Sequence, residues 1–303
     1  MAGLKELRTR LTAVKSTKKI TTAMKLVAAA KLKKAVSALE KNAGYAMLVE
    51  NAVKRVLLEY QKEEVSKKIK HLLPPIFNVS SNPEKYLLLV FSSERGLCGT
   101  YNQNVAKTAI KRICELQKNG KIVSLICYGK KAYDILKKDY KELIVHHEAS
   151  FAGGGIFYDE AVQMAQKILQ LYQDKSFDMC EMICGVFQSA AHHETLILPA
   201  YPLDAALLGT DENLDHVDDA YFDYKPSKQD VLEVASQQLM VNNIYRAMLG
   251  AEASEQSERM IAMDNATRNA EDMGRKLTLK YNTLRQSAIT TELTEIISGA
   301  EAL

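Results

Sequence analysis

Proline is confined to the middle of this chain. All six prolines lie between positions 74 and 226, so the first 73 and the last 77 residues contain none. Proline breaks helix interiors because its ring removes a backbone donor and clashes with the preceding turn. The sequence therefore predicts a long helix at each end of the chain and a different kind of structure between them.

The N-terminal segment carries a sustained apolar repeat. Positions spaced alternately three and four residues apart form a seam in which 13 of 17 residues are apolar. Such a repeat is typical of a coiled coil, and the stretch would be about 85 Å long as a helix. Three of the four polar exceptions lie together at Lys18, Thr21 and Lys25. The predicted seam consists of Leu4, Leu7, Leu11, Val14, Lys18, Thr21, Lys25, Ala28, Leu32, Ala35, Leu39, Asn42, Ala46, Val49, Val53, Val56 and Tyr60.

A second seam runs through the C-terminal segment. Upstream of it, apolar residues between 231 and 249 keep a face in a looser register. Gly250 and Gly274 each cost a helix about 1 kcal/mol relative to alanine, so packing against a partner helix must offset them. The two end segments are therefore expected to pair as an antiparallel coiled coil. The predicted C-terminal seam consists of Met263, Ala266, Ala270, Met273, Leu277, Lys280, Leu284, Ser287 and Thr291.

The middle of the chain alternates between strand and helix patterns. Strands are expected at 86–91, 122–127, 143–145, 179–187 and 196–198, with helices near 101–118, 130–138 and 158–173. This alternation predicts a mostly parallel sheet with helices on its faces. The expected fold is a Rossmann-like α/β domain inserted between two long helices, with residues 1–70, 71–227 and 228–303 as the three parts.

Charge is distributed unevenly over these parts. The net charge of +3 divides into +11 for residues 1–70, −5 for residues 71–227 and −3 for residues 228–303. The basic N-terminal part is suited to an acidic partner. No stretch approaches the roughly 18 consecutive apolar residues of a membrane span, so any membrane association is expected to be peripheral. The basic N-terminus continues the helical pattern. It is therefore interpreted as part of the folded chain rather than as a cleaved targeting peptide.

Five cysteines form no zinc-ribbon pattern, which indicates reduced thiols and a cytosolic compartment. Cys180 and Cys184 would face the same side of a strand. The two thiols could form a disulfide or bind a metal ion. Two small buried apolar side chains are the simpler interpretation, and the one that the sequence favours.

A turn containing Ser92-Ser93-Glu94-Arg95-Gly96-Leu97-Cys98-Gly99 follows the first strand, where α/β proteins bind phosphates. It lacks the spacing of a dinucleotide or Walker motif. Cys98 could be a nucleophile, but no defined His/Asp set accompanies it. A structural turn is the better interpretation.

Two histidine pairs and a glycine run are weaker candidates. His146-His147 and His192-His193 could bind a metal, but neighbours on a strand point to opposite faces. The run at 153–155 could hold an anion through its amides, or serve as a flexible loop before a helix. We therefore expect no metal and no cofactor.

The stretch from Ser16 to Lys31 allows two interpretations. Its lysines could be solvated at a coiled-coil irregularity, while Ile20, Met24 and Val27 shift the apolar stripe round the helix. Alternatively, the helix presents lysines and an exposed methionine to an acidic partner.

Three motifs in this sequence resemble the γ subunits of F-type ATP synthases. The run Thr17-Lys18-Lys19-Ile20-Thr21 leading to Met24 is similar to the N-terminal signature of that family. The Arg-Gly-Leu-Cys-Gly turn at 95–99 is a second landmark. The third comprises 253–260, 281–282 and 285–300, so the resemblance touches both ends and the middle of the chain.

The resemblance implies a non-catalytic rotor shaft that couples proton-driven rotation of the c-ring to ATP synthesis at the β subunits. The implied partners are three α and three β subunits, the ε subunit and the c-ring, with δ reached through the complex. The implied location is peripheral, on the cytoplasmic side of the bacterial inner membrane. The extreme C-terminal turns, ending at Leu303, would lie in an apolar bearing.

By the same resemblance, Met24 and Lys25 would meet an acidic loop of a β subunit. Tyr224 and Lys225 would lie near the ε and c-ring contacts, although relatives commonly carry an acid at the position of Lys225. A regulatory cysteine-bearing insertion is not visible between Gly185 and Tyr221. Polar coupling contacts with the α/β ring are implied for Arg259, Gln286, Thr290 and Glu292.

Two other functions remain as alternatives. The first is a nucleotide-binding α/β enzyme with coiled-coil arms. The second is a nucleic-acid binder that uses the basic helix, although no aromatic residue precedes Tyr45 for base stacking.

Overall fold

The computed structural model describes residues 2–62, 74–77, 79–80, 82–149, 155–189, 192–204 and 223–301. The chain forms two compact units. The helical unit consists of residues 1–30 and 258–303, and the α/β unit consists of residues 31–257. Both boundaries fall within long helices. The division at 70 and 227 expected from the sequence stays a prediction, and its first boundary lies outside the described residues.

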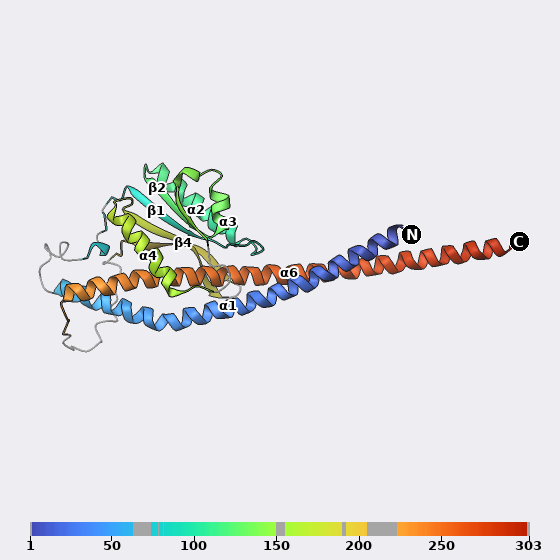
Figure 1. Cartoon of the computed structure of the whole chain (residues 1–303), viewed down its shortest axis with the longest axis horizontal. Helices are drawn as coiled ribbons and strands as arrows, with labels where there is room; N and C mark the ends of the chain where they lie inside the picture. Colours follow the sequence, from blue (N-terminus) through green and yellow to red (C-terminus); the bar gives the residue numbers. More distant parts are fainter. Residues whose placement is uncertain are drawn as a thin grey trace. The chain divides into compact units, whose positions relative to one another are not determined.

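Two long helices occupy the proline-free ends, as predicted (Figure 1). Helix α1 comprises Ala2–Lys62 and helix α6 comprises Lys228–Glu301. All 17 positions of the predicted N-terminal seam are buried or half-buried. The apolar repeat therefore identified the face of α1 that packs. None of the described helices is long and apolar enough to cross a membrane.

In the helical unit, α1 and α6 pair in antiparallel directions, but the predicted C-terminal seam is partly wrong. Met273 is 53% exposed and Lys280 is also exposed. Gly274 and Tyr281, one position later in each case, are half-buried instead. The seam of a heptad repeat advances in alternating steps of three and four residues. After Ala270, the next seam residue is therefore either Met273 or Gly274. Gly274 gives no apolar signal at the seam, because it has no side chain to pack. A Cβ atom added there would lie 3.8 Å from Val14 Cγ1.

The far end of the predicted seam is also wrong. Leu284 is 40% exposed, and Ser287 and Thr291 are exposed. With Val14 beside Gly274, the antiparallel register places Leu284 opposite Leu4, the first seam residue of α1. Ser287 and Thr291 lie beyond Ala2, where α1 begins, and have no partner surface on α1. The apolar pattern of this segment therefore does not report packing against α1.

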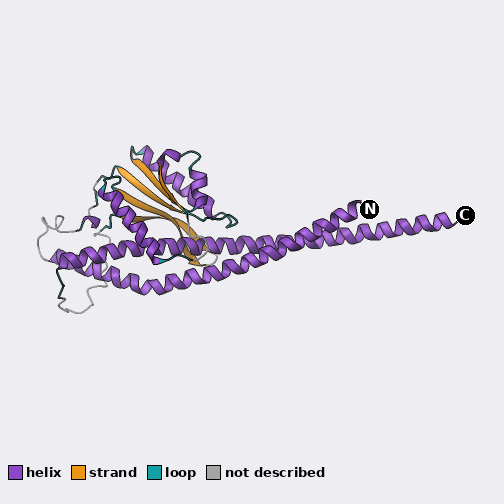
Figure 2. Ribbon diagram, in the orientation of Figure 1, coloured by secondary structure: helices purple, strands orange, loops and turns teal. Residues whose placement is uncertain are grey.

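The α/β unit contains a five-stranded sheet with helices on both faces (Figure 2). Its strand order is β3-β2-β1-β4-β5, with β1 to β4 parallel and β5 antiparallel to β4. The order 3-2-1-4 is that of a doubly wound nucleotide-binding sheet, so the mostly parallel, Rossmann-like expectation is confirmed. The strands comprise β1 Lys85–Phe91, β2 Ile122–Tyr128, β3 Ile144–Glu148, β4 Met179–Ser189 and β5 His192–Tyr201.

The helices of this unit cover the sheet unequally. Helices α2 and α3 pack on one face, against Leu88 and Val90 of β1. Helix α4 and the parts of α1 and α6 that belong to this unit pack on the other, against Leu87 and Leu89. Side chains alternate along a strand, so the apolar run of β1 serves both cores. The bounds are α2 Tyr101–Lys118, α3 Lys130–Leu136 and α4 Tyr158–Gln173, with short 3-10 helices η2 Pro75–Phe77 and η3 Lys141–Leu143.

Candidate functional site

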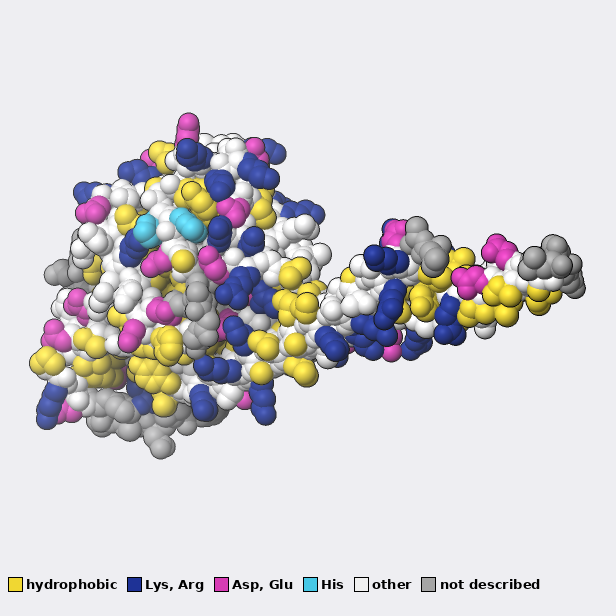
Figure 3. Space-filling view, turned by 45° about the vertical axis from the view of Figure 1, so that its right-hand side comes forward, with side chains coloured by type: hydrophobic (Ala, Val, Ile, Leu, Met, Phe, Trp, Pro, Cys, Tyr) yellow, Lys and Arg dark blue, Asp and Glu magenta, His cyan; other side chains and the backbone are white. Residues whose placement is uncertain are grey.

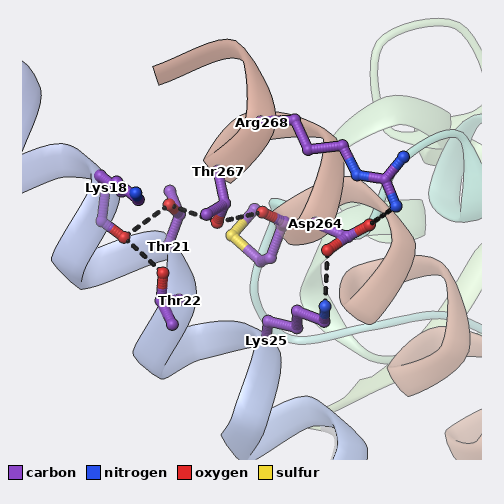
Figure 4. A network of polar contacts seen from close by, with 8 residues as sticks. Lys18, Thr21, Thr22, Lys25, Asp264, Thr267 and Arg268 are labelled. Carbon is purple, nitrogen blue, oxygen red and sulfur yellow. Dashed lines mark hydrogen bonds and ion pairs between the residues drawn. The ribbon is translucent and has the colours of Figure 1, made fainter. Parts of the chain in front are cut away.

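The polar interruption of the α1 seam faces polar residues of α6. In the helical unit, Lys25 Nζ lies 2.5 Å from Asp264 Oδ1, and Lys18 Nζ lies 3.3 Å from Glu271 Oε1. Figure 4 shows Thr21 between these lysines, facing α6. The three polar seam residues therefore have partners within the chain. Neither interpretation of this stretch from the sequence anticipated that arrangement.

Two hydroxyl groups join the helices between the ion pairs. Thr267 Oγ1 lies 2.7 Å from Thr21 Oγ1 and 2.7 Å from the carbonyl oxygen of Met263. The Thr21 hydroxyl donates in turn to the carbonyl oxygen of Lys18 at 3.1 Å. Thr21 is only 8% exposed, so its hydroxyl needs this bonding to be accommodated in the seam.

Each carboxylate of this interface also contacts an arginine one turn further along α6. Asp264 Oδ2 lies 2.8 Å from Arg268 Nη2, and Glu271 Oε1 lies 3.3 Å from Arg275 Nη2. The two rungs are seven residues apart on both helices, so the arrangement repeats once per heptad. We call this set the polar ladder. It consists of Lys18, Thr21, Lys25, Asp264, Thr267, Arg268, Glu271 and Arg275.

The cations of the ladder favour the charged form of both acids. The hydrogen bond from Lys25, together with Arg268, lowers the pKa of Asp264. The hydrogen bond from Lys18, with a further contribution from Arg275, lowers the pKa of Glu271. Both acids carry negative charge at neutral pH and partly compensate the basic α1 helix.

Away from the ladder, α1 exposes apolar side chains. Ile20 is 59% exposed, Leu26 65% and Val27 58%. Met24 is half-buried, next to Lys25. Figure 3 shows lysine and arginine side chains gathered beside hydrophobic ones along this unit. A surface that is both basic and apolar is suited to a protein partner with acidic and apolar groups.

The four coupling residues expected on α6 differ in accessibility. Arg259 is half-buried, whereas Gln286, Thr290 and Glu292 are exposed. The Thr290 hydroxyl donates to the carbonyl oxygen of Gln286 at 3.0 Å, which leaves its oxygen able to accept.

The last turns of α6 expose an apolar stripe. Ile289, Leu293, Ile296 and Ile297 are 47–68% exposed and recur at helical spacing. The stripe lies just before the extreme C-terminal turns that are expected to sit in an apolar bearing. Leu303, at the end of those turns, lies outside the described residues.

The Tyr224–Lys225 region lies in the α/β unit, where α6 begins. The Tyr224 hydroxyl donates to Glu59 Oε1 at 2.8 Å, and Lys228 Nζ lies 3.0 Å from Glu59 Oε2. Burial and the hydrogen bond to Glu59 raise the pKa of Tyr224 to about 12. Lys225 pairs with Asp223 at 3.1 Å, and both side chains are about four-fifths exposed. Tyr224 is thus attached to α1, whereas Lys225 projects outward.

The turn after β1 is closed by its own hydrogen bonds. The Ser93 hydroxyl donates to the carbonyl oxygen of Arg95 at 2.6 Å, and Asn102 Nδ2 lies 3.0 Å from Cys98 Sγ. Asn102 Oδ1 accepts from the Ser93 backbone amide at 3.0 Å. Cys98 is 2% exposed. These contacts support the structural interpretation of this turn.

The remaining candidates have simple structural surroundings. The His147 ring stacks on the Tyr133 ring of α3 with 4.1 Å between ring centroids. His146 Nε2 lies 3.8 Å from Glu148 Oε2, two residues along the same strand. The two histidines therefore point to opposite faces of the sheet, as predicted. Cys180 and Cys184 are both fully buried in one core cluster. Over the described part of the chain, no group of three or more His, Cys, Asp or Glu residues could hold a metal ion. Residues 153 and 154 and the side chains of 192 and 193 lie outside the described set.

Known proteins match the chain over its whole length. The sequence model of the family described as ATP synthase matches residues 3–303. The ATP synthase gamma chain of Rhodospirillum rubrum is 36% identical over 307 residues, covering 100% of both proteins. That of Beijerinckia indica is 37% identical over 309 residues with the same coverage. The chain belongs to the ATP synthase gamma-chain family.

Solved structures share the fold of this gamma-chain family member. A central-stalk chain of the Tetrahymena thermophila mitochondrial ATP synthase has a TM-score of 0.60 at 24% identity, covering 82% of this chain and 99% of that one. A chain of the Euglena gracilis mitochondrial ATP synthase has a TM-score of 0.65 at 19% identity, covering 99% and 94%. These similarities confirm the long terminal helices with an inserted α/β domain.

The sequence interpretation missed the α6 side of the polar ladder. A signal was present, because an acid followed four residues later by arginine occurs twice, seven residues apart, at Asp264 and Glu271. Lys18 and Lys25 are also seven residues apart, so matching the two heptads would have paired them.

Proposed function

We propose that this chain is the central rotor shaft, the γ subunit, of a proton-translocating F-type ATP synthase. The observation that supports this most strongly is the 36% identity to a named ATP synthase gamma chain across the full length of both proteins. In this role the chain transmits rotation of the c-ring to the catalytic sites on the β subunits. It contributes no catalytic residue itself, and it regulates ATPase activity and proton flow through the state of the shaft.

The helical unit has the properties that such a shaft needs. Two paired helices resist bending better than a single chain, and the ladder holds them together by polar contacts as well as packing. Coupling requires contacts whose strength differs between successive states of the ring. Exposed polar and apolar groups on the unit provide such differences when the unit turns past successive subunits.

The proposed partners are three α and three β subunits, the ε subunit and the c-ring, with δ reached through the complex. The complex is proposed to lie at the bacterial inner membrane, with this chain peripheral on the cytoplasmic side. The excess positive charge of residues 1–70 supports an acidic partner for α1.

The residue contacts are part of the same proposal. Met24 and Lys25 are proposed to meet an acidic loop of a β subunit, and Lys225 with Tyr224 to meet ε or the c-ring. The accessible positions of Lys25 and Lys225 support these roles, with side chains 41% and 83% exposed. Contacts with the α/β ring are proposed for Arg259, Gln286, Thr290 and Glu292, of which the last three are exposed.

Co-purification tests the proposal. An affinity-tagged copy of this chain is expected to bring down three α and three β subunits per copy, as counted by native mass spectrometry. The complex should hydrolyse ATP and rotate a bead attached to the chain. Recovery of the chain without these subunits would contradict the proposal. Micromolar binding of ATP to the chain alone would favour the enzyme alternative, and a salt-sensitive complex with DNA would favour the nucleic-acid alternative.

A further inference from the structure

Asp264 lies between two cations and contacts each through a different oxygen. Its Oδ1 atom is bonded to Lys25 of α1, and its Oδ2 atom to Arg268 of α6. The side chains of Lys25, Asp264 and Arg268 are 41%, 25% and 75% exposed. The carboxylate is therefore the least accessible member of the group.

This arrangement allows Lys25 to change partners. If an acidic group approaches, the ammonium group can turn toward it without leaving Asp264 uncompensated, because Arg268 stays bonded to the second oxygen. An exposed ion pair is weak, since water screens both charges. Exchange between an internal and an external carboxylate therefore requires little free energy in either direction.

We propose that Asp264 is a positioning residue for Lys25 in the coupling contact. It holds the ammonium group against α6 and competes with the acidic partner for it, so the contact forms and breaks as the shaft turns. This inference rests on the proposed function, because it assumes that Lys25 meets an acidic group of the ring. Arg268 keeps Asp264 charged and bonded while Lys25 is engaged elsewhere.

The charges of the group predict the direction of the effect. Lys25, Asp264 and Arg268 together carry a net charge of about +1 at neutral pH. Asp264→Asn raises this to about +2 and removes the competitor, so the external contact should become too persistent. Adding Arg268→Gln to that variant restores about +1. The conservative variant Asp264→Glu keeps the competing carboxylate.

Glu271 is a matched control within the same ladder. It also lies between a lysine of α1 and an arginine of α6, one heptad away, at Lys18 and Arg275. Glu271→Gln therefore removes an equivalent pair from the helix interface. It leaves Lys25 and its partner unchanged, so it reports the purely structural effect of losing a rung.

The experiment uses the whole complex in inverted membrane vesicles from a strain that lacks its own γ subunit. The measured quantity is the ratio of ATP-driven proton pumping to ATP hydrolysis, with the amount of assembled complex determined by immunoblot. We expect Asp264→Asn to lower this ratio about two- to five-fold, the factor associated with a partly exposed ion pair. Asp264→Glu and Glu271→Gln should stay near the parent value. The Asp264→Asn/Arg268→Gln double variant should stay as low as Asp264→Asn, because it restores the net charge without restoring the competing carboxylate.

Lys25→Gln separates failure of this inference from failure of the proposed contact. If Lys25→Gln changes the ratio but Asp264→Asn does not, the role of Asp264 is overturned while the proposed contact stands. An equal fall in the pumping-to-hydrolysis ratio for Asp264→Asn and Glu271→Gln would also overturn the role of Asp264, because both substitutions would then act through the pairing of the helices. If Asp264→Asn has no further effect in the Lys25→Gln background, Asp264 acts through Lys25 as inferred. If Lys25→Gln leaves the ratio unchanged, the contact and the inference both fail.

Discussion

Gly185 of β4 lies against Ser254 of α6 at a distance that leaves no room for a side chain. A Cβ atom at position 185 would lie 2.8 Å from Ser254 Cβ and 2.9 Å from Tyr101 Cε2. Ser254 and Tyr101 are buried, at 0% and 3% exposure. Within the α/β unit, the sheet and α6 are therefore packed almost backbone to backbone at this point.

Gly185→Ala is expected to destabilise the chain by about 1–3 kcal/mol, because overpacking forces neighbouring groups to shift. The measurement is urea unfolding of the purified chain followed by circular dichroism. Gly44→Ala is the matched control, since nothing lies within 4 Å of the added Cβ in that exposed helical position. It should stabilise α1 by about 0.5–1 kcal/mol. Equal effects of the two substitutions would contradict the close approach.

Arg112 of α2 is expected to be important because it compensates a buried acid. Its Nε and Nη2 atoms lie 2.8 and 2.6 Å from the two carboxylate oxygens of Glu181, whose side chain is 10% exposed. Arg112→Met should cost about 2–3 kcal/mol, because removing one partner leaves a buried charge and the arginine is itself partly exposed. Glu115→Gln removes the weaker contact at 3.5 Å and should stay within about 0.5 kcal/mol. Thermal unfolding of the two variants would show no difference if the Glu181 pair were unimportant.

Acid should weaken the pairing of the helices in the helical unit. The pKa values of Asp264 and Glu271 are lowered in the folded chain by Lys25 and Lys18. A lowered pKa contributes stability above the unfolded value, about 4 for these acids, and this contribution disappears as pH falls through the folded pKa. Thermal unfolding should therefore show the parent to be more stable than the Asp264→Asn/Glu271→Gln double variant at pH 7. The difference should shrink toward pH 3, and a constant difference would exclude titration of these two acids as its source.

Met24→Lys is expected to leave assembly intact but to uncouple ATP hydrolysis from proton pumping. The substitution adds a cation beside Lys25, where an acidic loop of the ring is proposed to approach, so the contact becomes too strong. Proton pumping and ATP hydrolysis in membrane vesicles provide the measurement. Ala13→Lys adds the same charge at an exposed position more than two turns earlier and should have little effect. Normal coupling in the Met24→Lys complex would count against this placement of Met24.

Local patterns predicted most of the fold. The absence of proline located α1 and α6, and the strand and helix patterns of the middle located the sheet and the helices that cover it. The seam of α1 was identified at every position because enough apolar side chains mark it to extend the repeat through its four polar positions. The seam of α6 was misplaced at Met273 because Gly274 has no side chain and gives no apolar signal. The antiparallel direction of β5 was not predicted either, since strand direction depends on the whole path of the chain.

The sequence by itself determined that two helices form at the ends of the chain and that an α/β sheet forms between them. These features depend on interactions between residues close in sequence, which periodicity and proline placement report directly. Only the tertiary structure decided what the polar break in the α1 seam does. Lys25 meets Asp264 across 239 positions, and that pairing depends on the register between two helices. Spacing within either helix leaves this register open, because an apolar heptad seam can align at several offsets.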